Sequence, residues 1–592
     1  MRERVLGIET EYAVIYHPGR MDRERPSKLA LYRRFEAALR GRVRSLPNAF
    51  SPLRGKGGRF LENGATFHYE ATAEEYEDGL IEMASPECRD PYTLIRFERA
   101  KDELVEELAD EVNRELELAG YSGRVRVGKN NVDSQGHTFG SHESYWVEDP
   151  LPLLTRFLVV PLWAVLWLVS LPVLALVLAV QVALILCVVA FVLVLLGCGL
   201  LLAAVRSSAA QPLFRWVERQ AERMESHPGD IARRVQRLVA PIYPLMRLHS
   251  ALYNRFCFRR FRRDLTAFLV TRTVFSGAGA VAFDGGPLYR LAQRPPFLRT
   301  LARIFPGGEE RPVFETRDLF FRPLSILRSR RRLHLLIGDA NLCEWAQVLR
   351  VGAAALVLEA IESGLAGNWP QLADPLAALQ RVNLNPELEV ELELEDGSRA
   401  SALEIQRRYL DGVREVLTQT GQPLADWKAR VLRDWEETLR LLERDPEALA
   451  DRVDWVAKRQ LLLREIGDLR DWEELRKRGA AVMREGGART DEEHRLRDLA
   501  YRAWRVDLRY HEMGPRGGYR RLERRHRIVR LSDPAAVARA RTEPPDDTRA
   551  WARGQAIKWA HTHALSGGAA WHRVRLGKFG WRWFTDPLDP QR

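Results

Sequence analysis

Cysteine is scarce in this chain of 592 residues, and charge is missing from one long stretch of it. The five cysteines show no Cys-x-x-Cys pair and no spacing typical of a metal site; they are Cys88, Cys187, Cys198, Cys257 and Cys343. This argues against a disulfide framework and fits a reducing cytoplasm. We expect no signal peptide, because the opening residues MRER lead directly into a strand-like pattern.

The uncharged stretch covers residues 157–205, in which Gln181 is the one strongly polar side chain. A helix crosses the ~30 Å core of a bilayer with about 20 apolar residues, so this run is long enough for two crossings. Because lipid offers no water to a bare backbone, we expect an inserted transmembrane helical hairpin. The alternatives are a buried helical pair in a soluble core, or a first segment that is re-entrant or interfacial because of Pro161 and Pro172.

Positive charge is concentrated just after this run. Residues 206–263 contain 13 arginines and 4 acidic residues, and the whole chain has a formal net charge of +11. Basic flanks stay on the cytoplasmic side of a membrane, so we expect both ends of the run to lie there. Membrane lipid is the expected partner of this flank, and we expect no nucleic acid.

Near the N-terminus, residues 5–16 alternate as in a strand and place Glu9 and Glu11 on one face. Two carboxylates on one strand face repel unless a cation lies between them. A divalent metal ion would serve, whereas a solvated face with nearby arginines is the plain structural interpretation. The strand predicted at 65–70 places Thr66, His68 and Glu70 on one face in the same way.

Further along the chain, residues 81–88 predict another strand and residues 93–118 an amphipathic helix. Residues 129–145 form a polar run between strands that includes His142, a pattern more typical of the rim of a site than of a core. Residues 400–480 are helical in pattern and are most simply packing helices.

Twelve short motifs, in this order, resemble the family of Pup–protein ligases and Pup deamidases (depupylases), which are proteasome accessory factors. They are GIETEY at 7–12, NGA at 63–65, ASPEC at 84–88, KNNVD at 129–133, GSHESY at 140–145, FLVTR at 268–272, GAG at 277–279, TRD at 316–318, RRLHLLIGDANL at 331–342, ALVLEAIESG at 355–364, ALEIQRRY at 402–409 and PPDDTRA with its RG at 544–554. Together they span nearly the whole chain outside residues 146–264.

The resemblance implies an α+β fold similar to glutamine synthetase. This fold is a curved antiparallel sheet with helices on its outer face, and a small C-terminal domain. We expect four parts: 1–150 and 264–495 form the catalytic domain, 151–263 the membrane hairpin and basic insertion, and 496–592 the C-terminal domain. The implied cofactors are ATP and Mg²⁺, and the implied partners are a Pup-like protein modifier and lysine-bearing protein substrates. The implied location is the bacterial inner (cytoplasmic) membrane, with the catalytic part facing the cytoplasm.

The resemblance also implies roles for individual residues. Glu70 aligns with the catalytic carboxylate. The metal-site residues are Glu9, Glu11, His68, Glu82, His142 and His334, and the ATP-binding residues are Thr66, Ser85, Arg272, Arg549 and Trp571. Three of these positions depart from the family pattern, which has aspartate at Glu70, tyrosine at His68 and arginine at Thr66. In addition, the loop between Glu70 and Glu82 is longer, and the family's EPHAD after TRD is replaced by LFFR at 319–322.

Our leading hypothesis is a membrane-anchored, ATP-dependent ligase that joins the C-terminal Glu of a Pup-like modifier to substrate lysines through an acyl-phosphate. The hydrolytic sister activity of the family is the second hypothesis, because KNNVD, GSHE and GDANL look closer to that branch. A non-catalytic receptor for a tag is a third, because of the substitutions at Thr66, His68 and Glu70. A small-molecule carboxylate–amine ligase is a fourth, since the fold class hosts those too.

Overall fold

The structure is a computed structural model. It describes residues 4–22, 24–49, 56–71, 79–132, 138–149, 259–284, 286–303, 311–315, 328–365, 367–421, 423–484, 487–577 and 580–591, together with scattered residues between 152 and 248. The replaced motif LFFR at 319–322 and most of the loop between Glu70 and Glu82 lie outside the described residues.

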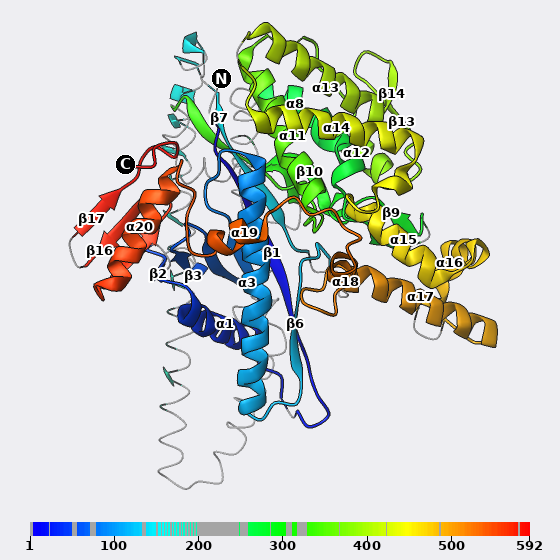
Figure 1. Ribbon diagram of the computed structural model, residues 1–592, viewed down its shortest axis with the longest axis horizontal. Coiled ribbons are helices and arrows are strands. Elements are labelled where there is room, and N and C mark those ends of the chain that lie inside the picture. The colour runs from blue at the N-terminus through cyan, green and yellow to red at the C-terminus, as the bar shows by residue number, and fades with distance from the viewer. Residues whose placement is uncertain are drawn as a thin grey trace.

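A large sheet is organised around β1 (Leu6–His17), which runs behind the long helix α3 in Figure 1. Within the described residues the sheet has ten strands in the order β10-β11-β12-β7-β1-β5-β4-β3-β2, and β6 also pairs with β1. The strands that follow β1 in this order are β5 (Gly79–Ala84), β4 (Thr66–Ala71), β3 (Lys56–Leu61) and β2 (Ser45–Pro47). Those that precede it are β7 (Ser141–Glu148), β12 (Arg330–Leu335), β11 (Arg311–Glu315) and β10 (Leu298–Arg303), and β6 is Arg124–Gly128.

The sheet is mixed, which corrects the expected antiparallel one. Strands β10 and β11 are parallel, whereas the other pairs of the sheet described above are antiparallel. Seven residues lie between β10 and β11, and they are outside the described residues. The α+β class itself is as predicted.

One face of the sheet is covered by α1 (Lys28–Arg42) and α3 (Pro91–Leu118). Tyr12 and Phe67 point to this side and are fully buried with residues of both helices. The same side also contains buried charges. The hydroxyl of Tyr12 donates to Asp102 (2.6 Å), and the ammonium of Lys101 donates to the hydroxyl of Thr10 (3.0 Å) and to Glu98 (2.6 Å). These bonds hold β1 on its helix-covered face through Thr10 and Tyr12, which alternate with Glu9 and Glu11 along the strand.

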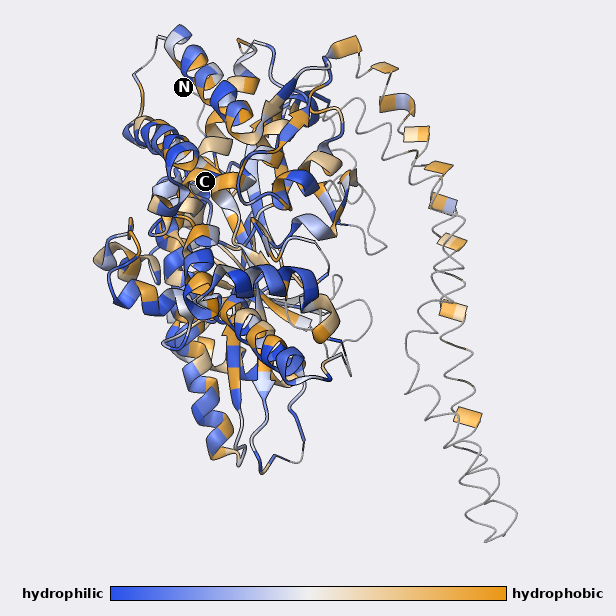
Figure 2. Cartoon of the chain, turned by 90° about the vertical axis from the view of Figure 1, so that its right-hand side faces the viewer, coloured by the Kyte–Doolittle hydropathy of each residue, from blue (hydrophilic) through white to orange (hydrophobic). Residues whose placement is uncertain are grey.

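A helical layer continues the core beyond β7, at the upper right of Figure 1. It consists of α8 (Arg259–Thr271), α9 (Thr273–Ser276), α11 (Glu344–Ser363), α12 (Pro375–Asn383), α13 (Ala402–Gln419), α14 (Asp426–Arg444), α15 (Asp454–Ile466), α16 (Leu469–Val482) and α17 (Asp491–Tyr510). Figure 2 shows hydrophilic and hydrophobic residues mixed along the helices of the molecule, and among those named above α13 and α14 carry a buried apolar face typical of amphipathic helices packed on a core. The predicted helical character of residues 400–480 is confirmed.

The C-terminal unit packs against β2 and β3. After α18 (Gly518–Arg524) and α19 (Pro534–Ala540), it contains α20 (Arg549–Thr562) and a small sheet of β15 (Gly567–Ala570), β16 (Arg573–Leu576) and β17 (Gly580–Trp583). A buried ion pair fastens this unit, because the guanidinium of Arg553 donates to both carboxylate oxygens of Glu87 at 3.1 and 2.6 Å. The predicted domain boundary at 495/496 lies inside α17, and the domain division stays a prediction.

This ion pair predicts an acid-sensitive contact between the C-terminal unit and the sheet. Burial raises the pKa of the Glu87 carboxyl, but Arg553 and Arg549 lower it by more than this. The net pKa is about 2, against an ordinary 4.5. The folded state therefore holds the charged carboxylate more strongly than the unfolded chain does. At ~1.4 kcal/mol for each pH unit of difference, the pair contributes about 3 kcal/mol above pH 4.5, and this is lost as the pH falls toward 2. The free energy of unfolding, measured by urea denaturation at each pH in this range, should therefore fall less steeply toward low pH in Glu87→Gln than in wild type.

The described residues on either side of 150–258 lie close to one place, the C-terminal end of α11. At the end of β7, the backbone amide of Glu148 donates to Glu362 (2.8 Å), and Glu362 also pairs with Arg4 (2.5 Å). Where the chain returns in α8, the guanidinium of Arg260 lies 3.7 Å from the point where a Cβ on Gly364 would stand. The two ends of the insertion are thus close together.

The predicted transmembrane hairpin is not supported by the structure. Crossing a bilayer takes about 20 consecutive apolar residues in one helix. Across the described part of the chain, no helix combines that length with sufficient apolar character. Most of residues 157–205, on which the prediction rested, lie outside the described residues. The hairpin is therefore removed from the fold class, and the membrane lipid partner inferred from it loses its basis.

Candidate active site

The strand pairings gather the predicted site residues on the sheet face opposite α1 and α3. Glu9 stands opposite His142 of β7, and Glu11 stands opposite Glu82 of β5. His68 of β4 stands opposite Glu82 on its other side. Side chains of directly opposed residues point to the same face, and alternation then places Thr66 and Glu70 there as well. His334 of β12 stands opposite Ser144, two residues after His142, and joins them.

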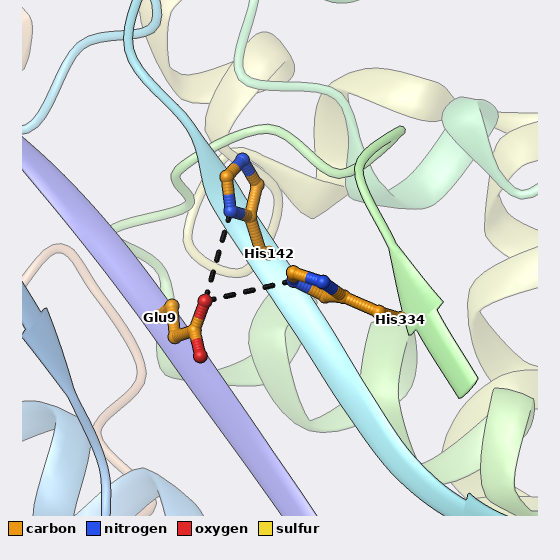
Figure 3. Close-up of side chains that lie close together, drawn as sticks. All are labelled: Glu9, His142 and His334. Carbon is orange, nitrogen blue, oxygen red and sulfur yellow. Dashed lines mark ion pairs between the residues drawn. The ribbon is translucent and has the colours of Figure 1, made fainter. Parts of the chain in front are cut away.

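Glu9, His142 and His334 form the first of two close sets (Figure 3). The Oε2 atom of Glu9 lies 3.9 Å from Nδ1 of His142 and 3.6 Å from Nε2 of His334. Its Oε1 atom accepts a hydrogen bond from Arg332 at 2.7 Å. Burial raises the pKa of the Glu9 carboxyl, but Arg332 and the two histidines lower it to well below the ordinary value. Glu9 is therefore held as a carboxylate.

Glu11, Glu70 and Glu82 form the second set, with one carboxylate oxygen of each within 4.8 Å of the others. The backbone amide of Gly140 donates to Oε2 of Glu11 (2.5 Å), while Oε1 of Glu11 lies 3.9 Å from Nε2 of His142. Three carboxylates at this separation repel one another, and oxygen donors are the ligands that Mg²⁺ takes in proteins. The residues present therefore fit a divalent cation of that kind.

His68 and Trp571 extend the site toward the C-terminal unit. The ring of Phe60 packs edge-on against His68 (centroids 6.1 Å apart) and against Trp571 (5.4 Å). Gly58 of β3 stands opposite His68, and a Cβ there would lie 2.1 Å from the imidazole Cδ2. The chain therefore needs glycine at this position to accommodate the histidine ring. Trp571 is brought near the site as predicted, although its contact with nucleotide stays a prediction.

The other predicted ATP-binding residues differ in placement. The hydroxyl of Thr66 accepts from the backbone of Ala84 (3.3 Å), and that of Ser85 accepts from Ile8 (3.0 Å), so both are tied to the sheet that carries the site. Arg549 contacts Glu87 at 2.8 Å, on the C-terminal side. Arg272 is not brought to the site, because its guanidinium is bound to Glu143.

The guanidinium of Arg272 is buried in a two-bond contact with Glu143, at 2.6 and 2.9 Å. Glu143 follows His142 on β7, so it points to the opposite face of the sheet. There it also accepts from the hydroxyl of Tyr145 (2.6 Å) and lies 3.5 Å from Arg350. This arrangement is a core ion cluster, and it separates Arg272 from the metal-binding face.

Two residues at the site were missed from the sequence, Arg332 and Gly140. Arg332 stands two residues before His334 on β12, so alternation alone would have placed it on the same face once that strand was assigned. Gly140 lies beneath His142, and a Cβ at this glycine would stand 2.2 Å from the imidazole Nε2. Its presence in the GSHESY motif was the available signal.

The Gly140→Ala variant should lose activity without losing its fold. The added methyl forces the ring of His142 away from both sets, and a displacement of ~1 Å in a catalytic group can lower a rate by up to about 100-fold. We expect at least about a tenfold fall in ATP turnover with little change in melting temperature. Gly41→Ala is the matched control, since nothing lies within 4 Å of the added Cβ there. Equal turnover in the two variants would show that His142 is not held by this contact.

The α+β fold, together with the carboxylates and histidines on this face of the sheet, defines a class of proteins whose central sheet can hold divalent cations. Within that class, the family model described as "Pup-ligase protein" matches residues 4–575, so the chain belongs to the Pup-ligase family. The predicted family and the predicted enzyme class, an ATP-dependent ligase, are thereby confirmed.

Known relatives come from both branches of the family. The chain is 26% identical over 584 residues to a Pup–protein ligase of Acidimicrobium ferrooxidans, covering 97% of this chain and 93% of that protein. It is 37% identical over 317 residues to a depupylase of Acidothermus cellulolyticus, covering 53% of this chain and 57% of that protein. The shorter match therefore has the higher sequence identity.

Two solved structures share the fold. The complex of the prokaryotic ubiquitin-like protein Pup with its ligase PafA has a TM-score of 0.65 at 23% identity, over 99% of this chain and 90% of that chain. The Pup ligase PafA in complex with ADP has a TM-score of 0.59 at 23% identity, over 97% and 93%. At this identity the likeness concerns the fold.

Proposed function

We propose that this chain is a ligase that uses ATP to join the C-terminal Glu of a Pup-like modifier to the side chain of a substrate lysine. The observation that carries the proposal is the pair of donor sets around Glu9 and Glu11 in a chain of the Pup-ligase family. Similarity to Pup–protein ligases over 97% of the chain supports this direction of reaction. The acyl-phosphate is the expected activated form of the modifier.

The residues on the sheet face have separable tasks. Divalent cations bound there would neutralise phosphate charge and bridge phosphate oxygens. Glu11 and Glu82 would hold such an ion, and Arg332 would orient Glu9 by occupying one of its two oxygens. Trp571, which packs edge-on against the buried ring of Phe60, would offer an aromatic face to the nucleotide base at the edge of the site.

Glu70 is the residue we assign to proton removal. A lysine amine has an ordinary pKa of ~10.4, so it arrives protonated and cannot attack until a base takes its proton. Glu70 lies on the site face within reach of the Glu11–Glu82 set, where the amine must approach the activated carbonyl. It occupies the position at which the family has aspartate.

The deciding experiment uses the full-length protein with ATP, Mg²⁺ and three substrates. These are a Pup-like tail ending in Glu plus an acceptor protein, the same tail ending in Gln, and a preformed isopeptide conjugate. Conjugate appearing on gels only with the Glu tail supports the ligase. Ammonia released from the Gln tail, or acceptor freed from the conjugate, supports the sister activity instead. Absence of all three products, in protein that binds ATP, would refute both.

The hydrolytic reaction is the second candidate because of one observation. The 37% identity to a depupylase over 317 residues exceeds the identity to the ligases. For that reaction Glu70 would take a proton from water rather than from lysine. Substitution of Glu70 therefore tests both candidates, and the substrate decides between them.

A further inference from the structure

We propose that an arginine-rich surface on α17 and α18 binds the phosphate backbone of double-stranded DNA without reading its sequence. This α17–α18 surface consists of the exposed arginines of residues 494–530 whose side chains make no ion pair or hydrogen bond with another described residue: Arg505, Arg509, Arg516, Arg521, Arg525 and Arg527. The proposal is independent of the ligase reaction. It departs from the expectation of no nucleic acid, which was drawn from residues 206–263.

Positive charge dominates this part of the chain. Residues 494–530 contain 12 arginines, no lysine and 4 acidic residues, which leaves a formal net charge of +8. Three of the four acidic side chains are paired with cations of other elements; the pairs are Asp507 with Lys458 (2.6 Å), Glu523 with Arg99 (2.8 Å) and Glu512 with Arg126 (3.8 Å). The outward positive charge is therefore little opposed, and such a field attracts polyanions.

The local geometry brings the arginines of the two helices to one junction. Arg505 and Arg509 lie four residues apart on α17, and Arg521 and Arg525 lie four residues apart at the end of α18, so the two members of each pair are neighbours on their helix. The start of α18 lies against the end of α17, because a Cβ on Gly518 would stand only 3.0 Å from a backbone Cα atom there. Figure 1 shows α17 projecting from the body at the lower right, with α18 beside its inner end. The two pairs therefore flank one junction on an outer part of the molecule.

Two adjacent arginines of α18 differ in what their guanidinium groups do. Arg520 is buried and donates to Glu106 (2.6 Å) and to Glu523 (2.9 Å), so it joins α18 to α3. Arg521 is exposed and has no such acceptor in the described part of the chain. The fold thus uses Arg520 and leaves Arg521 to the solvent. A guanidinium can donate two parallel hydrogen bonds to a phosphate, which a surface of this kind offers repeatedly.

The composition of the surface favours duplex DNA over other polyanions. Interfaces with proteins and with single strands rely on aromatic side chains, but Tyr501 is the one large hydrophobic side chain exposed among residues 494–530, all of which the structure describes. Double-stranded RNA is recognised in part through its 2′-hydroxyls, and residues 494–530 contain no Ser, Thr, Asn or Gln. Duplex DNA offers one negative charge per ~1.7 Å of its axis, which arginines neutralise without contacting a base.

Arginines that are simply solvated would have the same geometry, so the test measures binding directly. Full-length, nucleotide-free protein is titrated into a fluorescently labelled DNA duplex of mixed sequence at several salt concentrations, and anisotropy reports binding. If six phosphates are neutralised, the logarithm of the affinity should fall with that of the salt concentration with a slope of about −5. Combining Arg509→Gln, Arg521→Gln and Arg525→Gln should weaken binding at low salt by at least about tenfold and change the slope to about −3.

The matched control removes the same charge from other exposed helix positions. Arg408→Gln, Arg433→Gln and Arg440→Gln on α13 and α14, combined in one protein, should leave binding and slope as in wild type. Equal affinity and slope in the two triple variants would overturn the proposal. Absence of DNA binding by the wild-type protein would overturn it whether or not the variants fold. Tighter binding of polyglutamate, of duplex RNA or of a single strand than of duplex DNA would do so as well.

Discussion

The Glu70→Gln variant should bind ATP normally and form conjugate about 10²–10⁴ times more slowly than wild type, the usual cost of losing a general base. The amide keeps the size of the side chain but accepts no proton from the incoming lysine. Rates are best taken from a single turnover, with the modifier already activated, so that nucleotide binding does not mask the effect.

Two further variants sharpen this expectation. Glu70→Asp restores the residue type that the family carries and shortens the reach of the carboxylate, so we expect a rate between wild type and Glu70→Gln. Glu117→Gln removes an exposed carboxylate at the end of α3 and should leave the rate unchanged. Wild-type rates in Glu70→Gln would instead assign Glu70 to cation binding alone and leave the base to be found elsewhere on the sheet face.

The second large effect concerns stability. Glu143→Gln should lower the free energy of unfolding by about 3–5 kcal/mol, because it leaves the buried guanidinium groups of Arg272 and Arg350 without their counter-charge. Burial raises the pKa of Glu143, but the two arginines lower it overall, which shows how strongly they stabilise the carboxylate. Urea denaturation followed by tryptophan fluorescence measures the loss.

A paired variant distinguishes the core cluster from a nucleotide contact. If Arg272 acts only through Glu143, the double variant Arg272→Met with Glu143→Leu should recover the part of the stability that Glu143→Gln loses at Arg272, since apolar replacements of a buried pair are often tolerated, while Arg350 stays without its counter-charge. Its affinity for ATP should match that of wild type. A large loss of ATP affinity in a stable double variant would return Arg272 to the nucleotide site.

Much of the site face could be predicted from local alternation. Glu9 with Glu11, and His68 with Glu70, lie two residues apart on strands whose opposite face carries apolar residues such as Ile8 and Phe67, and the period of two is a property of the strand itself. What alternation does not give is which strands become neighbours. The contact between Arg332 and Glu9 joins residues far apart in the chain, and only the pairing of β12 with β7 brings Arg332 to that face.

The errors have equally specific causes. Arg272 was placed by its motif alone, and its contact with Glu143, a residue far away in the chain, could not be read from the sequence, so its role at the nucleotide stays a prediction. The hairpin was inferred from hydropathy, which measures the transfer preference of residues 157–205 and not the element that they form. The parallel pairing of β10 with β11 was missed because no pattern in the sequence marked it.

The close approach of Glu148 and Arg260 to the end of α11 makes the chain divisible there. Glu9 and His142 belong to residues 4–149, whereas His334 and Arg332 belong to residues 259–591, so neither fragment carries the whole set of Glu9, His142 and His334. Expressed as two polypeptides, the fragments would regain a full set only by reassociating across β7 and β12. Ligand binding at the site would then reveal that the two fragments have reassociated. Residues 150–258 could likewise be exchanged for another module without changing the strand pairing that builds the site.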